Sequence, residues 1–142
     1  MLDPRELQIL THLRKDARTT MADIAKATET PISTVFEKLK KHNQTTIKKF
    51  TTILDFPKLG YNIRKKILVS ALEPDEVIHF LNLHPNVNSL YKTNNGFNIV
   101  ADCIFKEMNT WYDFKQKLYL HSITETKIID ITDEIKREEF LT

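Results

Sequence analysis

Five lysines lie between residues 38 and 49, in a stretch that contains no acidic residue. They are Lys38, Lys40, Lys41, Lys48 and Lys49. Ammonium groups at this density suit a phosphate backbone, and the hydroxyls of Ser33 and Thr34 just before them are suited to hydrogen bonds with base edges. The spacing therefore predicts a polyanion-binding surface, with a solvated helix face as the alternative.

The charge distribution supports this interpretation. The chain of 142 residues has a net charge of only +2, but its first 54 residues hold 10 Lys/Arg against 6 Asp/Glu. The remaining residues hold 11 Lys/Arg against 13 Asp/Glu. The basic excess is thus N-terminal, as expected for a nucleic-acid-binding part joined to a part with another task.

Residues suited to catalysis or metal binding are scattered. The five histidines form no pair at the helical i, i+4 spacing of a metal site, and His79 and His84 lie five residues apart. No nucleophile is recognisable beside its base. The single cysteine, Cys103, excludes an internal disulfide framework, agrees with a reducing compartment and is expected in the core. We therefore expect no enzyme activity, no catalytic residue, no metal site and no cofactor.

Helix signals at three places organise the basic half. Asp3, Pro4 and Glu6 form a capping box with proline in the first turn, which predicts the start of a helix. Thr20 is a suitable cap for a short second helix through Ala27. Thr30 and the proline after it repeat the signal and predict a third helix reaching about His42. Two short helices joined by a tight turn predict a helix-turn-helix.

The third predicted helix has two different faces. At 100° per residue its apolar side chains fall on one side: Ile32, Val35, Phe36 and Leu39. The other side carries polar residues: Ser33, Thr34, Glu37, Lys38 and Lys41. One face is expected to pack and the other to be presented to a major groove, whereas a three-helix packing module is the alternative.

The second half alternates strand and helix patterns. After a linking strand over residues 47–54, we predict strands over 65–72, 87–93, 97–105 and 124–131. Helices are predicted from Pro74 to about His84 and over 108–118. Asn95 and Gly96 indicate a type I′ hairpin turn. Apolar residues on both faces of 97–105 leave one face for the helices and one for a partner.

The predicted fold is α+β, an N-terminal winged helix-turn-helix followed by a ferredoxin-like βαββαβ domain with a four-stranded antiparallel sheet. We place the DNA-binding domain at residues 1–46, a hinge strand and linker at 47–62, and the second domain at 63–142. No apolar run approaches the roughly 20 residues of a membrane span, and no positive leader precedes the first helix. A cytoplasmic protein without membrane contact is expected.

Several short strings, in this order and spacing, resemble the Lrp/AsnC family of feast/famine transcription regulators. They read LD, ILTHL, DAR, MADIA, STV, LDFPKLGY, PNV, NGFN and SITET, at residues 2–3, 9–13, 16–18, 21–25, 33–35, 54–61, 85–87, 95–98 and 122–126. No single string is decisive, but together they cover nearly the whole chain.

The resemblance implies a sequence-specific regulator that binds double-stranded DNA, with a second domain for effector binding and dimerisation. A homodimer implies a pseudo-palindromic operator, and tetramers or octamers of such dimers occur in such families. The expected DNA-binding residues are Ser33, Thr34, Glu37, Lys38, Lys40, Lys41, Lys48 and Lys49. The expected effector-binding residues are Asn95, Gly96, Phe97, Asn98, Thr124 and Thr126.

Departures from the family pattern bear on both sites. His42 stands where the family usually has Leu, and the following turn is one residue shorter. At the hairpin the family usually has Gly at position 95 and an acidic residue at position 98, where this chain has Asn95 and Asn98. A carboxylate for an amino group is thus missing, so an ordinary amino-acid effector is not expected.

Two other functions remain open. Siroheme decarboxylases share this architecture and act on a tetrapyrrole, although no local string indicates such an enzyme. A regulatory partner protein without DNA binding is the other alternative, and the hydroxyls and lysines of the third helix speak against it.

Overall fold

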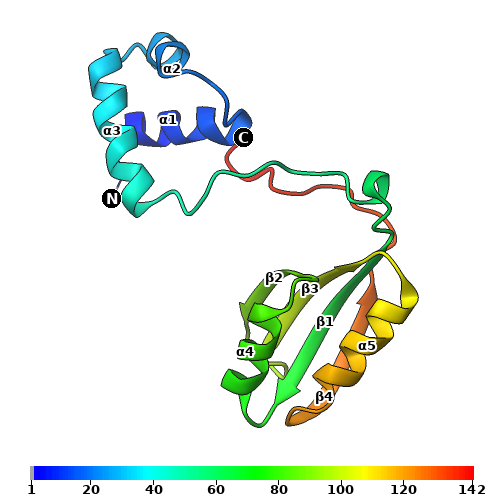
Figure 1. The fold of residues 1–142 in the computed structure, drawn as a ribbon. Coiled ribbons are helices and arrows are strands. Elements are labelled where there is room, and N and C mark those ends of the chain that lie inside the picture. The colour runs from blue at the N-terminus through cyan, green and yellow to red at the C-terminus, as the bar shows by residue number, and fades with distance from the viewer. Residues whose placement is uncertain (1) are drawn as a thin grey trace. The chain divides into compact units, whose positions relative to one another are not determined.

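The computed structural model describes residues 2–142 and divides the chain into two compact units (Figure 1). The first unit takes in the chain up to Ile53 together with Lys136–Thr142, and the second is Leu54–Ile135. The sequence-based division had assigned everything after residue 62 to the second domain. The last seven residues belong with the first unit because the guanidinium of Arg14 bonds to Glu138 and Phe140.

Helices make up the secondary structure described in the first unit. They are α1 (Pro4–Lys15), α2 (Met21–Thr28) and α3 (Ile32–Thr45). Their common core is small, since its fully buried members are Ile9, Ile24 and Val35, with Leu13 and Leu39 partly buried around them. The expected three-helix arrangement is thus confirmed, on a core of one aliphatic side chain from each helix.

Two of the three predicted helix caps are confirmed. Asp3 and Glu6 form a complete capping box at α1, and the Thr20 hydroxyl accepts from the backbone N–H of Asp23 at 3.0 Å. The cap predicted at Thr30 is wrong, because Pro31 is the N-cap of α3 and the Thr30 hydroxyl donates to the Thr28 carbonyl instead. The helix also runs three residues beyond His42.

The predicted linking strand is not formed. Residues 47–55 carry no strand, so the described part of the first unit contains no wing strand either. A strand needs a ladder partner for its backbone groups, and β-forming residues alone do not provide one. A short 3₁₀ turn, η1 (Pro57–Leu59), follows and ends at Gly60 with φ of 89°.

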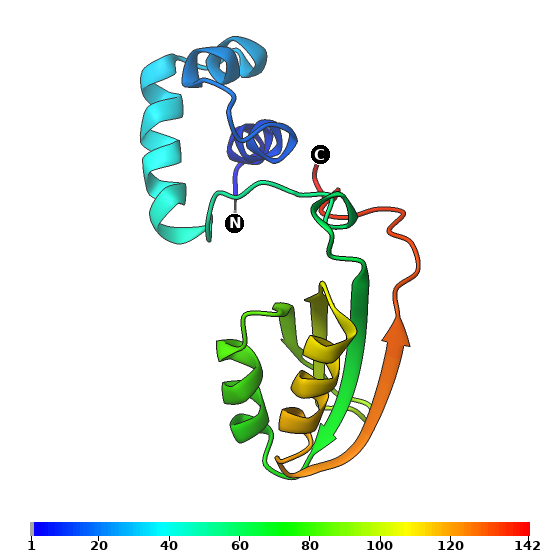
Figure 2. The same ribbon diagram turned by 45° about the vertical axis from the view of Figure 1, so that its right-hand side comes forward.

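The second unit has the predicted βαββαβ order. Its elements are β1 (Ile63–Ala71), α4 (Pro74–Leu83), β2 (Val87–Lys92), β3 (Ile99–Phe105), α5 (Met108–Leu118) and β4 (Ile123–Asp130). The strands form one antiparallel sheet in the order β2-β3-β1-β4. Figure 2 shows α4 and α5 on the same face of this sheet. The fold class is therefore confirmed.

Alternate residues of β1 and β3 lie on the helix-covered face of the sheet and are buried there. Ile67, Val69 and Cys103 are fully buried there, together with Phe105 and with Phe114 from α5. Burial raises the pKa of the Cys103 thiol to about 12, so this cysteine is a packing residue, as expected. Within residues 2–142, no helix is both long and apolar enough to cross a membrane.

The opposite sheet face combines apolar and charged residues. Tyr91, Val100 and Leu68 form a continuous row, because Val100 pairs directly with Tyr91 on one side and with Leu68 on the other. Beside them the guanidinium of Arg64 donates to both oxygens of Asp102, at 2.9 and 3.1 Å. These hydrogen bonds raise the pKa of Arg64 above its usual value. No helix of residues 2–142 covers this face (Figure 2).

The β2–β3 hairpin has positive φ at both residues of its tip, as the predicted turn requires. Asn95 has φ of 72° and Gly96 has φ of 102°, as a turn with two left-handed residues requires. The ladder closes farther back, where the N–H of Thr93 donates to the carbonyl of Asn98 at 3.0 Å. The loop between these two residues is therefore four residues long, rather than the two of a tight hairpin.

Asn98 fastens this hairpin to the end of β1. Its side-chain Oδ1 accepts from the backbone N–H of Ala71 at 3.1 Å, and its Nδ2 donates to the Ala71 carbonyl at 2.9 Å. Its own N–H donates to the carbonyl of Val69. The amide side chain thus replaces one further rung of the β1–β3 ladder, and it needs both a donor and an acceptor to do so.

Replacing Asn98 by Asp should therefore destabilise the protein by about 1 to 3 kcal/mol at pH 7, because the new carboxylate oxygen would face the Ala71 carbonyl without a proton between them. The loss should shrink at pH 4, where a protonated carboxyl can donate. Urea unfolding of Asn98→Asp and of the parent at both pH values measures this. Asn94→Asp, at an exposed position of the same loop, is the control. An equal loss of stability in both variants would contradict the role of the Asn98 side chain as a rung of the β1–β3 ladder.

At Gly96 we expect a purely conformational effect. A Cβ placed there has no atom within 4 Å, so Gly96→Val should cost about 1 to 2 kcal/mol through its positive φ alone. Gly96→Asn should be close to neutral, because Asn tolerates this region. Thermal unfolding of both variants tests the assignment, and equal midpoints for Val and Asn would show that the φ is not required.

Candidate nucleic-acid interface

A tight turn joins α2 to α3. Helix α2 ends at Thr28, and its C-cap Glu29 has a left-handed φ of 50°. The N–H of Thr30 donates back to the Ala25 carbonyl at 3.0 Å. Pro31 then begins α3 with its carbonyl accepting from Thr34 and Val35. Only residues 29–31 separate the two helices, which is the length that a helix-turn-helix requires.

Most of the side chains predicted to contact DNA are exposed. On α3 these are Ser33, Glu37, Lys40 and Lys41, and in the segment that follows they are Lys48 and Lys49. Thr34 is half-buried at the edge of the packed face. The structure therefore places the hydroxyl, carboxylate and ammonium groups of α3 along an open helix surface, with two further lysines shortly after its end.

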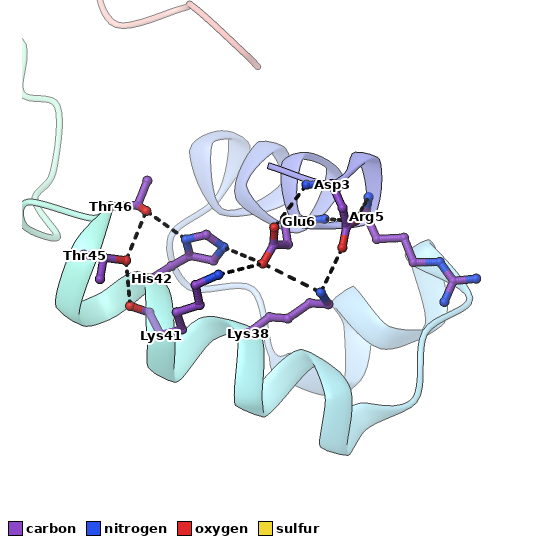
Figure 3. Close-up of polar contacts among 8 residues, drawn as sticks. All are labelled: Asp3, Arg5, Glu6, Lys38, Lys41, His42, Thr45 and Thr46. Atoms are coloured by element: carbon purple, nitrogen blue, oxygen red, sulfur yellow. Dashed lines mark hydrogen bonds and ion pairs between the residues drawn. The ribbon is translucent and has the colours of Figure 1, made fainter. Parts of the chain in front are cut away.

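Lys38 differs from the other lysines of α3, because its ammonium group donates a hydrogen bond to Asp3 at the start of α1 (Figure 3). It lies 3.0 Å from Asp3 Oδ2 and 3.7 Å from Glu6 Oε1, and its side chain is 23% exposed. The hydrogen bond to Asp3 is the main cause of the raised pKa of Lys38 and of the lowered pKa of Asp3. This ammonium is engaged within the protein.

Glu6 lies at the centre of the contacts between α1 and α3, as Figure 3 shows. Its Oε2 accepts from the Asp3 N–H at 3.1 Å, which is the main cause of the lowered pKa of Glu6. Its Oε1 lies 3.6 Å from both the Lys41 ammonium and His42 Nε2. One carboxylate, only 7% exposed at the residue level, thus completes the α1 cap and faces three basic side chains of α3.

His42 is 1% exposed and packs under the end of α3. Its Nδ1 lies 2.9 Å from the Thr46 hydroxyl, whereas its Nε2 has no hydrogen-bond partner within residues 2–142. The sequence identified this position as a departure from the family, but not its contact with Glu6. Its spacing of four and seven residues from Lys38 and Val35 was the available signal, since it places all three on one helix face.

The packing predicted for two apolar residues of α3 is wrong. Ile32 and Phe36 are 55% and 49% exposed, because the buried face of α3 runs through Val35, Leu39 and His42 instead. An open hollow of about 450 Å³ borders Phe36. It is lined by Leu13, Ala17, Met21, Phe36, Leu39, Lys40, Asn43, Gln44 and Phe50.

The expected effector residues come together around the end of β1. The carbonyl of Val69 accepts from Asn98, while Thr126 pairs with Val69 across the other edge of the strand. Three of their side chains already have partners. Asn98 bonds to Ala71, the Thr124 hydroxyl donates to the Ser70 carbonyl at 3.0 Å, and the Thr126 hydroxyl lies 2.9 Å from that of Tyr119.

Metal binding has no geometric basis in the described chain. Across residues 2–142, no three His, Cys, Asp or Glu side chains gather as a metal site would require. His121 pairs with Glu76 at 2.8 Å, and His84 packs edge-on against Phe114. Burial lowers the pKa of His84. Both histidines serve contacts of α4 and α5.

Comparison with known proteins agrees with this geometry. Residues 2–41 match the family model described as winged helix-turn-helix DNA-binding. Regulatory protein AsnC of Haemophilus influenzae is 32% identical, over 99% of this chain and 89% of that protein. The HTH-type transcriptional regulator FL11 of Pyrococcus furiosus is 30% identical, over 91% of this chain and 89% of that protein.

Solved structures share the fold of the whole chain. AsnC of E. coli superposes with a TM-score of 0.86 at 18% identity, covering 100% of this chain and 99% of that one. A transcriptional regulator of Neisseria meningitidis, solved as a complex with L-Met, gives 0.85 at 18% identity and covers 96% and 94%. The relatives, the matched helix-turn-helix and the exposed basic face of α3 lead to one conclusion: this chain belongs to the Lrp/AsnC family and is a DNA-binding transcription regulator.

Proposed function

We propose that α3 reads the operator with Ser33, Thr34 and Glu37, while Lys40, Lys41, Lys48 and Lys49 bind the phosphate backbone. The observation that supports this division is the exposed surface of α3, with small polar groups near the N-terminus and lysines farther along. Recognition helices contact base edges mainly through their N-terminal residues. The regulator acts in the cytoplasm, where its DNA lies.

Lys38 has another role in this proposal. Its ammonium is already bound to Asp3 and Glu6, so a phosphate contact would require both ion pairs to break. We assign Lys38 to the orientation of α3 on α1. Its contribution to DNA binding is then indirect, and it differs from that of the exposed lysines on the same helix.

A homodimer formed through the open sheet face is the proposed assembly. Leu68 and Val100 are half-buried there and Tyr91 is exposed, and none of the described helices covers them. An uncovered apolar row in the middle of a sheet needs a partner, and a second copy offers the same row by two-fold symmetry. Two-fold symmetry in turn implies a pseudo-palindromic operator with half-sites about one helical turn apart, or a multiple of it.

An amino-acid effector is not part of the proposed mechanism. The Neisseria meningitidis regulator was solved as a complex with L-Met. In this chain the side chains of Asn98, Thr124 and Thr126 hold β1 and α5, and none supplies a charge for an amino group. We therefore propose that operator binding proceeds without an amino acid.

Removing a phosphate contact should weaken binding without changing sequence preference. For Lys40→Ala we expect equal loss on operator and scrambled duplexes, and a salt slope lower by roughly one unit. Lys38→Ala should leave the slope unchanged and lower the unfolding midpoint, because it removes ion pairs between α1 and α3. Fluorescence polarisation titrations at several salt concentrations, with and without L-amino acids, measure these effects.

Lys117→Ala, which removes an exposed positive charge on α5, is the matched control. Thr34→Ala should relax the sequence preference mainly at one base position of each half-site. An equal drop in slope for Lys38→Ala and Lys40→Ala would contradict the separate role of Lys38. Equal affinity of the parent for both duplexes would contradict a specific operator, and a requirement for an amino acid would contradict effector-free binding.

The dimer face is tested by a charge in its apolar row. Leu68→Asp should shift the protein from dimer to monomer at micromolar concentration, because the carboxylate would be desolvated in the interface. Sedimentation velocity measures the shift, and circular dichroism checks the fold. Leu83→Asp, at an exposed position of α4, should leave the dimer intact. A Leu68→Asp protein that remains dimeric would place the interface elsewhere.

A further inference from the structure

Three basic side chains of α3 surround one carboxylate oxygen of α1 (Figure 3). Oε1 of Glu6 lies 3.6 Å from both the Lys41 ammonium and His42 Nε2. The Lys38 ammonium lies 3.7 Å from the same oxygen. Each distance is longer than the roughly 2.7 to 2.9 Å of a charge-assisted hydrogen bond. The three groups therefore share this oxygen, and they compete for it.

The competing groups differ in what else they contact. Lys38 also pairs with Asp3 at 3.0 Å, and His42 Nδ1 lies 2.9 Å from a threonine hydroxyl. Within the described part of the chain, Glu6 provides the single ion pair of Lys41, whose side chain is 64% exposed. Ion pairs of exposed side chains are weak. Lys41 is therefore the group that leaves Glu6 most easily.

His42 is the competitor whose charge can change. Histidine is the side chain that ordinarily gains or loses its charge between pH 5 and 8. The hydrogen bond from the Asp3 N–H lowers the pKa of Glu6, so the carboxylate stays ionised over that range. An ionised carboxylate only accepts hydrogen bonds, and a charged N–H of the ring is its strongest match. Two nearby ammonium groups oppose a third positive charge, so protonation of His42 is favoured when the Lys41 ammonium moves away.

The charged groups around His42 come from α1 and α3. They are Asp3, Glu6, Lys38 and Lys41. Within residues 2–142, the charged side chains of α2 and of the segment after α3 form no ion pair with His42 or Glu6. Because His42 is 1% exposed, little solvent screens these interactions. The charge of the ring is therefore coupled to Glu6, and through Glu6 to the two lysines.

We propose that His42 is a positioning residue: in its protonated form it pairs with Glu6, and the Lys41 ammonium is released to a DNA phosphate. This inference rests on the proposed phosphate contact of Lys41. The coupling is reciprocal, because a phosphate that draws Lys41 away from Glu6 favours a proton on His42. The regulator then binds DNA with one more phosphate contact at the acid end of the histidine range than at the alkaline end.

The first test follows the DNA-free, full-length protein by NMR from pH 8 to pH 5, so its result does not depend on DNA binding. The ring resonances of His42 and the carboxyl carbon of Glu6 should titrate with a common midpoint. The Nζ resonance of Lys41 should move over the same range, and it should not move in His42→Gln. A His42 ring that stays neutral down to pH 5 would overturn the proposal, as would a Lys41 resonance that moves equally in His42→Gln.

The second test measures the salt dependence of binding to a scrambled duplex at pH 8 and at pH 5, so it does not require a specific operator. In the parent the salt slope should be larger by roughly one unit at pH 5, because one more phosphate is neutralised. His42→Gln and His42→Leu do not take up a proton, and each should have the same slope at both pH values. Lys41→Ala lacks the released ammonium and should also have equal slopes.

His12→Gln, on α1, removes another histidine of the same unit and should keep the pH dependence of the parent. Circular dichroism checks the fold of each variant at both pH values. If both His42 variants keep the pH dependence of the parent, His42 does not control Lys41. If the DNA-free titration is observed but the slope of the parent is the same at both pH values, the phosphate contact assigned to Lys41 is wrong, and the proposal is overturned with it.

Discussion

The orientation of α3 depends on the carboxylate of Glu6, because the apolar core beneath that helix is small. Ile9, Ile24 and Val35 are its fully buried members, and burial of such side chains stabilises by roughly 1.5 to 3 kcal/mol each. Glu6 adds contacts that the aliphatic groups cannot make, since it closes the α1 cap and faces basic side chains of α3. The same carboxylate thereby completes the cap of one helix and pairs with basic side chains of another.

A similar division between packing and polar contacts holds in the sheet unit. The helix-covered face is closed mainly by hydrophobic side chains, among them Ile67, Cys103 and Phe114. On the other face Arg64 and Asp102 form an ion pair beside the apolar row. The Arg64 guanidinium also donates a hydrogen bond to Glu134, in the segment after β4. The carboxylates of Asp102 and Glu134 thus meet at one guanidinium, which joins the segment after β4 to the sheet.

The sequence predicted the second unit well, because its signals are local and mutually consistent. Alternating apolar residues, the proline at position 74 and the Asn95-Gly96 tip each specify an element without reference to the rest of the chain. The linking strand was predicted from β-forming residues and is not formed, since pairing is a property of two segments and not of one. The same reason explains Ile32 and Phe36: helical periodicity defines a side of α3, but the position of α1 decides how far that side is covered.

For the functional site, the residue types predicted a polyanion-binding surface on α3, and the order of motifs indicated the family. Lysines and hydroxyls at helical spacing contain that information, because charge and hydrogen-bonding capacity belong to the side chains themselves. Only the tertiary structure decided which lysines are available. Lys38 and Lys40 are two residues apart, yet the first faces Asp3 and the second faces solvent, and this difference depends on where a helix that begins 34 residues earlier is packed. Asn98 became a rung of the sheet for the same reason, since its partner Ala71 is brought to it only by the pairing of β1 with β3.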